Sequence, residues 1–367
     1  MTAPRLEVDL DKIEHNARTL VERLAKRGIS VTGVTKATLG SQEIARTLLK
    51  AGVNGIGDSR IENIESMRRA DVAATMTLIR SPMLSQTERV VAAADVSFNT
   101  EICVVKSLSN AAQRTGRNHG VVLMVEMGDL REGIMPADVE DAVYQTLLLP
   151  GITFMGIGTN LACRSGVSPD SNNMAELSTL TGSIEAKFGI PINVVSGGNS
   201  ANLNWASRGV DIGRVNNLRL GESILLGREP LYRQAIDGLF TDAITLVAEV
   251  IESKIKPSLP WGQIGQTAFG ESDRHVDRGQ VRQSILAVGI QDTDPDGLTP
   301  PLGMQIVGAS SDHLILESTT ECLNVGTEVA LQPDYSALLR SMTSPFVGWK
   351  RVTSRRVHYS CRSAAAQ

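Results

Sequence analysis

The sequence predicts a (β/α)8 barrel of the TIM type followed by a smaller, β-rich C-terminal domain. From about residue 30 to 225, short β-branched runs alternate with longer segments of helical periodicity, which is typical of a parallel sheet built from βα units. Beyond about residue 240, the runs are strand-like and are broken by Pro, Gly and Asp. A length of 367 residues is also too long for one average domain and favours two domains, or one barrel with an appendage.

Eight strand-like runs occur in the first part of the chain, and eight strands close a barrel. The segments between them have helical periodicity. In SQEIARTLLKAG, for example, Ile44, Leu48 and Leu49 recur at helical spacing and Gly52 suits the end of a helix. The eight runs are residues 31–36, 53–58, 75–80, 95–99, 120–127, 152–159, 192–196 and 211–220.

The second part of the chain has the turn-rich pattern of an antiparallel β domain, with runs such as SILAVGIQD, MQIVGA, HLILEST and TEVALQP. A ninth run, LEVDL, precedes the barrel, and we expect it to pair with the C-terminal domain. We therefore place the barrel at residues 11–237, the β-rich domain at 238–350 with residues 1–10 added to it, and a tail at 351–367.

Composition excludes several classes of function. A formal net charge of −4 provides no basic field for nucleic acid, so small molecules are the expected partners. No apolar run approaches the roughly 20 residues of a membrane span, and the N-terminus has no signal-peptide core. The four cysteines are scattered, without CxxC spacing, so we expect reduced thiols and a cytoplasmic protein: Cys103, Cys163, Cys322 and Cys361.

Polar residues follow several of the predicted strands. The active site of such a barrel lies at the carboxyl ends of the strands, because the βα loops converge there. We expect one mouth to collect the residues that end or follow strands one, three, six, seven and eight, which are Lys36, Arg80, Asn160, the segment 196–200 and Arg219.

Lys36 and two glycine-rich turns give this mouth a specific chemistry. A lysine desolvated at a strand end has a lowered pKa and can attack an aldehyde, although spacing alone favours an amine that reaches solvent. SGGNSANL (196–203) is a turn that opens a helix and can hold a phosphate, or is simply a tight turn with a serine cap. RLGESILLG (219–227) is a second such turn, and two turns on adjacent strands favour a phosphate.

Six segments, in order along nearly the whole chain, resemble the alanine racemase family, and most closely its ornithine racemase-like branch. The resemblance implies a pyridoxal-phosphate barrel joined to a β domain, and an enzyme that racemises an amino acid. The segments are VTKATLG (34–40), EMGDLREG (126–133), GTNLAC (158–163), RLGESILLG (219–227), GASSDHLILE (308–317) and QPDYSALL (332–339).

The resemblance also implies roles for individual residues. Lys36 would carry the cofactor as a Schiff base and act as the base on one face of the substrate α-carbon. Arg219 would bind the pyridine nitrogen and leave it unprotonated, which suppresses transamination. Arg131 would orient the substrate carboxylate. The cofactor would further be bound by Asn160, Ser200, Gly221, Glu222 and Tyr335.

Two more residues would come from a second copy of the chain. The backbone of Ser311 and the side chain of Asp312 would complete the site of a partner subunit, which implies a homodimer with shared active sites. Without the resemblance, other interpretations are as good. Arg131 could be a solvated loop charge, Tyr335 a residue at the edge of the core, and SSDH a polar turn before a strand.

The sequence departs from the family pattern where the second proton donor is expected. The family has a tyrosine before a glycine early in the β domain, whereas GQTAFGE (265–271) has Phe269 there. His313 is the candidate we put in its place, because a histidine exchanges protons near neutral pH, although a lone histidine is more often structural. Leu39 and Asn160 also replace a family tyrosine and histidine.

These departures favour longer substrates than alanine. We expect a racemase of basic amino acids, ornithine or lysine, with Glu271 or Asp334 available to pair with the distal amine. Three alternatives remain, namely an alanine racemase, a non-catalytic pyridoxal-phosphate carrier, and a lyase of the D-threonine aldolase kind. The carrier does not need the long β domain. The lyase binds a metal through a His-x-Cys motif that none of the five histidines forms, so no metal site is predicted.

Overall fold

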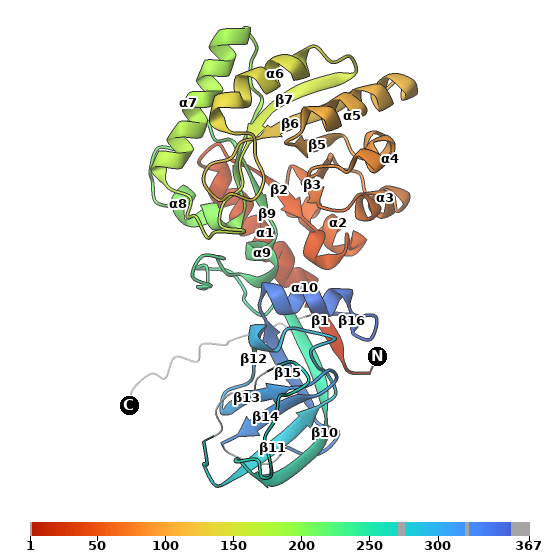
Figure 1. Ribbon diagram of the computed structural model, residues 1–367, viewed down its shortest axis with the longest axis vertical. Helices are drawn as coiled ribbons and strands as arrows, with labels where there is room; N and C mark the ends of the chain where they lie inside the picture. The colour runs from red at the N-terminus through yellow and green to blue at the C-terminus, as the bar shows by residue number, and fades with distance from the viewer. Residues whose placement is uncertain (1, 271–275, 320–322, 354–367) are drawn as a thin grey trace, which may run out of the picture.

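The computed structural model describes residues 2–270, 276–319 and 323–353. Eight parallel strands close a barrel in which the last strand pairs with the first, and an antiparallel sheet follows it (Figure 1). The predicted fold class is therefore confirmed. The barrel strands are β2 (Ser30–Val34), β3 (Gly55–Asp58), β4 (Met76–Leu78), β5 (Val96–Asn99), β6 (His119–Met124), β7 (Ile152–Gly158), β8 (Val194–Gly198) and β9 (Asn217–Leu220).

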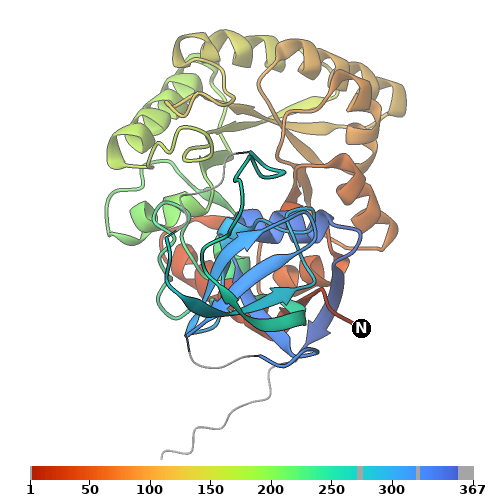
Figure 2. The same cartoon turned by 60° about the horizontal axis from the view of Figure 1, so that its bottom comes forward.

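Helices surround the barrel on its outside, as Figure 2 shows from a second direction. Local sequence signals set their limits. Ser41 caps α2, and Gly52 just after that helix has a positive φ of 99°. Asp170 forms a capping box at the start of α7. The helices are α1 (Leu10–Ala25), α2 (Gln42–Lys50), α3 (Ile61–Arg69), α4 (Thr87–Ala93), α5 (Ile102–Thr115), α6 (Val139–Leu147), α7 (Ser171–Phe188), α8 (Leu203–Ser207) and α9 (Glu222–Leu226).

The C-terminal sheet has the order β12-β15-β10-β11-β14-β13, and β1 joins it by pairing antiparallel with β10 and parallel with β16. The first strand of the chain thus lies in the second domain and not in the barrel. The members are β1 (Arg5–Asp9), β10 (Ile244–Pro257), β11 (Gln280–Leu286), β12 (Leu298–Thr299), β13 (Met304–Ala309), β14 (Leu314–Ser318), β15 (Glu328–Pro333) and β16 (Gly348–Val352).

Helix α10 (Tyr335–Thr343) lies between the sheet and the barrel (Figure 1). It contacts the 3₁₀ turn Lys36–Thr38, which directly follows the first barrel strand. The predicted domain boundary at 237 and 238 falls in the segment between α9 and β10. β16 includes residues 351 and 352 of the predicted tail, and the rest of the tail from 354 lies outside the described residues.

Two further expectations from the sequence concern membrane spans and cysteines. None of the described helices is long and apolar enough to cross a membrane. Cys103 and Cys163 are free thiols, while Cys322 and Cys361 lie outside the described residues.

Candidate active site

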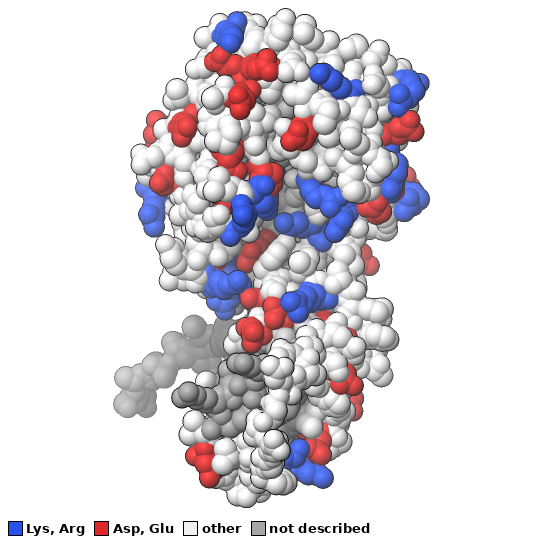
Figure 3. Space-filling model, in the orientation of Figure 1, with Lys and Arg blue, Asp and Glu red and all other residues white. Residues whose placement is uncertain are grey.

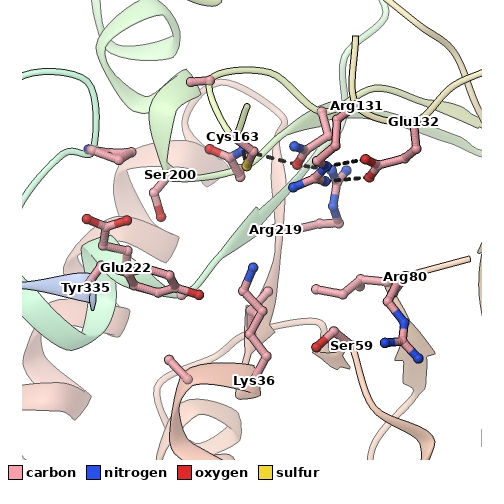
Figure 4. Close-up of a pocket in the computed structure, with 18 of the residues that line it drawn as sticks. Lys36, Ser59, Arg80, Arg131, Glu132, Cys163, Ser200, Arg219, Glu222 and Tyr335 are labelled. Atoms are coloured by element: carbon pink, nitrogen blue, oxygen red, sulfur yellow. Dashed lines mark hydrogen bonds and ion pairs between the residues drawn. The ribbon is translucent and has the colours of Figure 1, made fainter. Parts of the chain in front are cut away.

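A cavity of about 670 Å³ lies between the carboxyl ends of the barrel strands and α10. Basic side chains gather around the hollow in the middle of this face (Figure 3). Figure 4 shows the cavity in close-up. The structure brings eight of the predicted site residues together in its lining, namely Lys36, Arg131, Asn160, Ser200, Arg219, Gly221, Glu222 and Tyr335.

Lys36 projects into this cavity from a fixed turn. The chain leaves β2 at Val34 and forms the 3₁₀ turn that Lys36 begins, in which Thr38 donates to the carbonyl of Thr35 at 3.0 Å. Both threonines are buried, so the turn is packed and its geometry is set. The Lys36 amine points to the centre of the cavity in Figure 4 and lies 5.7 Å from the centroid of the Tyr335 ring.

Arg219 is the penultimate residue of β9 and is held from several directions. It donates to the Ser196 hydroxyl at 2.5 Å, to the Thr159 carbonyl at 2.9 Å and to Asn160 Oδ1 at 3.1 Å. Its guanidinium carbon lies 4.9 Å from the centroid of the Phe98 ring, a cation–π contact. Burial lowers the pKa of Arg219 to about 10, so the side chain remains a cation at neutral pH.

The support of Arg219 continues into the barrel as a chain of neutral hydrogen bonds. Ser196 donates to Asn217 Oδ1 at 2.8 Å. Asn217 in turn donates to the hydroxyls of Ser30 at 3.2 Å and Thr32 at 3.1 Å. Since neither hydroxyls nor amides change charge near neutral pH, the position of Arg219 does not depend on a titrating neighbour in this chain of groups.

Asn160 lines the cavity and carries a buried donor without a partner among the described residues. Its Oδ1 accepts from Arg219 and, at 3.1 Å, from Asn199. Its Nδ2 is buried and has no hydrogen-bond partner in the part of the chain that the structure describes. A buried amide donor is costly to leave unpaired, and a ligand oxygen in the cavity would satisfy it.

The two glycine-rich turns meet at one end of the cavity. Ser200 Oγ accepts from the Ser223 N–H at 3.2 Å, which ties the turn after β8 to the turn after β9. A Cβ built on Gly221 would lie 3.2 Å from the Val34 carbonyl oxygen, which is tight, so a side chain does not fit easily there. Burial raises the pKa of Glu222 to about 7, and burial also raises the pKa of the Tyr335 phenol.

Arg131 and Glu132 form the opposite end of the cavity in Figure 4. The Arg131 guanidinium donates through Nε and Nη2 to both carboxylate oxygens of Glu132, and this hydrogen-bonded carboxylate raises the pKa of Arg131. Their loop is anchored by buried Asp129, whose carboxylate accepts backbone N–H bonds from Cys163 at 3.2 Å and Arg164 at 2.9 Å, among others.

Three of the predicted site residues do not line the cavity of their own chain. Ser311, Asp312 and His313 occupy the turn between β13 and β14 and do not line the cavity. His313 Nδ1 lies 2.9 Å from Asp312 Oδ1, and both side chains are exposed. Phe269 is 56% exposed and also outside the cavity.

The structure adds cavity residues that sequence reasoning did not assign. Glu132 and Cys163 line the cavity beside residues that were assigned, and so does Arg233, which pairs with Asp334 at 2.7 Å. Glu132 and Cys163 belong to quoted motifs, so their place in those motifs was a usable signal. For Arg233 the sequence contained no such signal.

Comparisons with known proteins agree with the geometry. The family described as "Alanine racemase, N-terminal domain" matches residues 8–229. The chain is 39% identical over 349 residues to a lysine racemase of Thermotoga maritima, covering 95% of this chain and 98% of the relative. The chain belongs to the alanine racemase family. A second family relative, an ornithine racemase of Acetoanaerobium sticklandii, is 36% identical over 94% of this chain and 98% of its own length. The predicted resemblance is thereby confirmed.

Several solved structures share the fold at low sequence identity. Alanine racemase from Streptomyces lavendulae has a TM-score of 0.73 and 17% identity, covering 96% of this chain and 98% of that one. Alanine racemase from Bartonella henselae, solved with covalently bound pyridoxal phosphate, also gives 0.73 and 17%, covering 96% and 100%. A D-threonine aldolase from Filomicrobium marinum matches equally well at 0.73 and 17%, covering 93% and 88%. At these identities the likeness establishes the fold alone.

Proposed function

We propose that this chain is a pyridoxal-phosphate-dependent racemase of basic amino acids, with ornithine and lysine as its substrates. The observation that carries the proposal is the convergence of Lys36, Arg219 and Arg131 in one cavity of a chain that belongs to the alanine racemase family. The choice of basic substrates rests on the lysine and ornithine racemases, which align with this chain over nearly its full length.

The residues present fit pyridoxal phosphate. The cavity of about 670 Å³ is within the usual size range of cofactor sites. Asn160, which lines it, has a buried Nδ2 donor without a hydrogen-bond partner among the described residues. Gly221 leaves room where a side chain would be crowded, and a Glu222 carboxyl with a pKa of about 7 is partly protonated at neutral pH, which reduces its repulsion of a phosphate. Together these groups suit a ligand that carries a negative charge and a carbonyl group.

Each lining residue then has a task. Lys36 would hold the cofactor covalently and move the proton on one face of the substrate α-carbon. Ser200, Gly221, Glu222 and Tyr335 would hold the phosphate. When bound, pyridoxal phosphate supplies an electron-withdrawing group that stabilises negative charge at the α-carbon.

Arg219 and Arg131 would set the selectivity of the reaction. Arg219 would donate to the pyridine nitrogen, and because a group with a pKa of about 10 keeps its proton at neutral pH, it would leave that nitrogen unprotonated and disfavour transamination. Arg131 would bind the substrate carboxylate through Nη1, which has no partner among the described residues.

The face of the substrate opposite Lys36 would be served by a second copy of the chain. We propose a homodimer in which Ser311, Asp312 and His313 enter the partner's cavity, with His313 as the second proton donor. Their exposure outside their own cavity supports this arrangement. The β domain also exposes apolar side chains that a partner could cover, with Trp261 at 84% and Ile255 at 62%. A cytoplasmic location is part of the same proposal.

Chiral chromatography tests the function directly. The purified protein with pyridoxal phosphate is incubated with L-lysine, L-ornithine or L-alanine in D2O, and we expect D-enantiomers of the two basic amino acids together with deuterium at the α-carbon. Lys36→Ala is the control and is expected to lose both the product and the visible absorbance of protein-bound cofactor. Strict preference for alanine, or no exchange at all, would overturn the proposal.

A further inference from the structure

We propose that Glu132 is the residue that selects a substrate with a distal ammonium group. The inference rests on the proposed function and names a specificity-determining side chain within it. The positively charged end of ornithine or lysine needs a carboxylate inside the cavity, because an unpaired ammonium loses solvation there without compensation. Among the described residues, Glu132 and Glu222 are the two carboxylates that line the cavity.

Glu222 lies at the wrong end to receive the ammonium. It directly follows Gly221 and is grouped with Ser200 and Tyr335 on one side of the cavity in Figure 4, which is the side proposed for the phosphate. Glu132 and Arg131 lie on the opposite side, with Lys36 between the two groups. A substrate joined to the cofactor near Lys36 and directed away from the phosphate therefore approaches Glu132.

Other acidic groups near the cavity are already used by the fold. Glu126 accepts the N–H groups of Gly128 at 2.7 Å and Leu130 at 3.0 Å. Asp129 accepts several backbone N–H groups from residues 163–167. Asp334, a candidate from the sequence, caps α10 at Ala337 and pairs with Arg233 at 2.7 Å. The other candidate, Glu271, lies outside the described residues.

The geometry of the Arg131–Glu132 pair suits a molecule that carries both charges. Glu132 occupies the Nε and Nη2 edge of the guanidinium, which leaves the Nη1 edge for the α-carboxylate of the substrate. Two carboxylates on neighbouring edges of one guanidinium are roughly 7 Å apart, which a side chain of the length of ornithine or lysine can span. The Glu132 side chain lines the cavity and is 28% exposed, so its carboxylate is accessible to a ligand there.

A basic amino acid thus contacts both residues, with its carboxylate on Arg131 and its ammonium on Glu132. Alanine contacts Arg131 alone. The ammonium also offsets the negative charge that the substrate carboxylate adds next to Glu132. A charge-assisted contact in a partly buried site corresponds to a selectivity of roughly tenfold to a hundredfold.

The test compares lysine with norleucine, which replaces the ammonium by a methyl group, as substrates of the cofactor-loaded protein. We expect Glu132→Gln to lower kcat/KM for lysine by roughly tenfold to a hundredfold and to change that for norleucine little, because glutamine keeps a hydrogen bond to Arg131 but has no charge. Glu132→Leu is the second variant, with the same expected loss of preference. Glu176→Gln, on the exposed face of α7, is the matched surface control.

Binding of substrate fragments adds a readout independent of turnover. Calorimetry with 6-aminohexanoate and hexanoate, which lack the α-amino group, is expected to show preference for the amino compound in the wild type and its loss in Glu132→Gln. Equal losses for lysine and norleucine would mean that Glu132 only positions Arg131 and would overturn the inference, as would an unchanged preference. A wild type that racemises neither amino acid contradicts the proposed function instead.

Discussion

Glu222→Gln provides a pH-dependent stability test of how strongly the Ser200 and Glu222 end of the cavity is desolvated. Burial is the main cause that raises the pKa of Glu222 from 4.5 to about 7, and Asp334 and Glu229 add to it while Arg233 and Lys36 oppose it. A tenfold change in proton affinity corresponds to about 1.4 kcal/mol, so ionising this carboxyl in the folded protein costs about 3 kcal/mol more than in the unfolded chain.

The sign of the effect follows from which state holds the proton. Below about pH 4 the carboxyl is protonated in both states and contributes no difference. Between about pH 4.5 and 7 the folded protein keeps a proton that the unfolded chain has lost, so stability falls as the pH rises. Above about pH 7 the full cost is present. Glutamine cannot ionise and avoids it.

Urea unfolding of the cofactor-free protein measures this cost. We expect Glu222→Gln to be more stable than the wild type by about 3 kcal/mol at about pH 8 and by little at about pH 4. The exposed Glu176→Gln variant is expected to shift equally at both pH values. A gain for Glu222→Gln that does not grow between the two pH values would refute the assignment of Glu222 to a position where desolvation outweighs its charged neighbours.

Three further outcomes test the site. Ser196→Ala removes the 2.5 Å partner of Arg219 and is expected to weaken cofactor retention on dialysis by roughly tenfold, with partial recovery in Ser196→Thr. Unchanged retention in Ser196→Ala would mean that the other partners of Arg219 hold it in place. Asp129→Ala, which orphans the N–H groups of residues 163–167, is expected to lose about 2–4 kcal/mol in urea unfolding, and a loss below 1 kcal/mol would contradict the anchoring role. His313→Ala is expected to slow α-proton exchange from one enantiomer far more than from the other, whereas equal slowing would exclude it as the second proton donor.

The barrel was predictable because its strands are buried on both sides and therefore appear as continuous apolar runs between helical segments. Strand limits were less accurate. The eighth run was predicted as 211–220, but β9 contains only 217–220, because residues 212–215 form a turn in which Gly213 takes a positive φ of 56°. Pairing of β1 with the C-terminal sheet depends on contacts far apart in sequence.

The site was predictable to the extent that barrel geometry gathers strand ends. Lys36 and Arg219 follow from that rule, and the family resemblance added Tyr335, which reaches the cavity from the second domain. The sequence does not show which neighbouring side chains in the cavity form hydrogen bonds with each other. The unpaired Nδ2 of Asn160 and the pairing of Arg131 with Glu132 depend on side-chain orientations that only the folded barrel defines.

The charge balance of the cavity explains how a cationic site can accept a cationic substrate. Arg131 and Arg233 are each neutralised by a carboxylate, whereas Lys36, Arg80 and Arg219 line the cavity without an ion-pair partner among the described residues. The Ser200 end of the cavity, where the phosphate is proposed, lies opposite the Arg131 end, so a phosphate there would not pair with an ammonium held beside Arg131. Selection of ornithine or lysine therefore requires a negative charge on the Arg131 side of the cavity, and Glu132 is the side chain that supplies it.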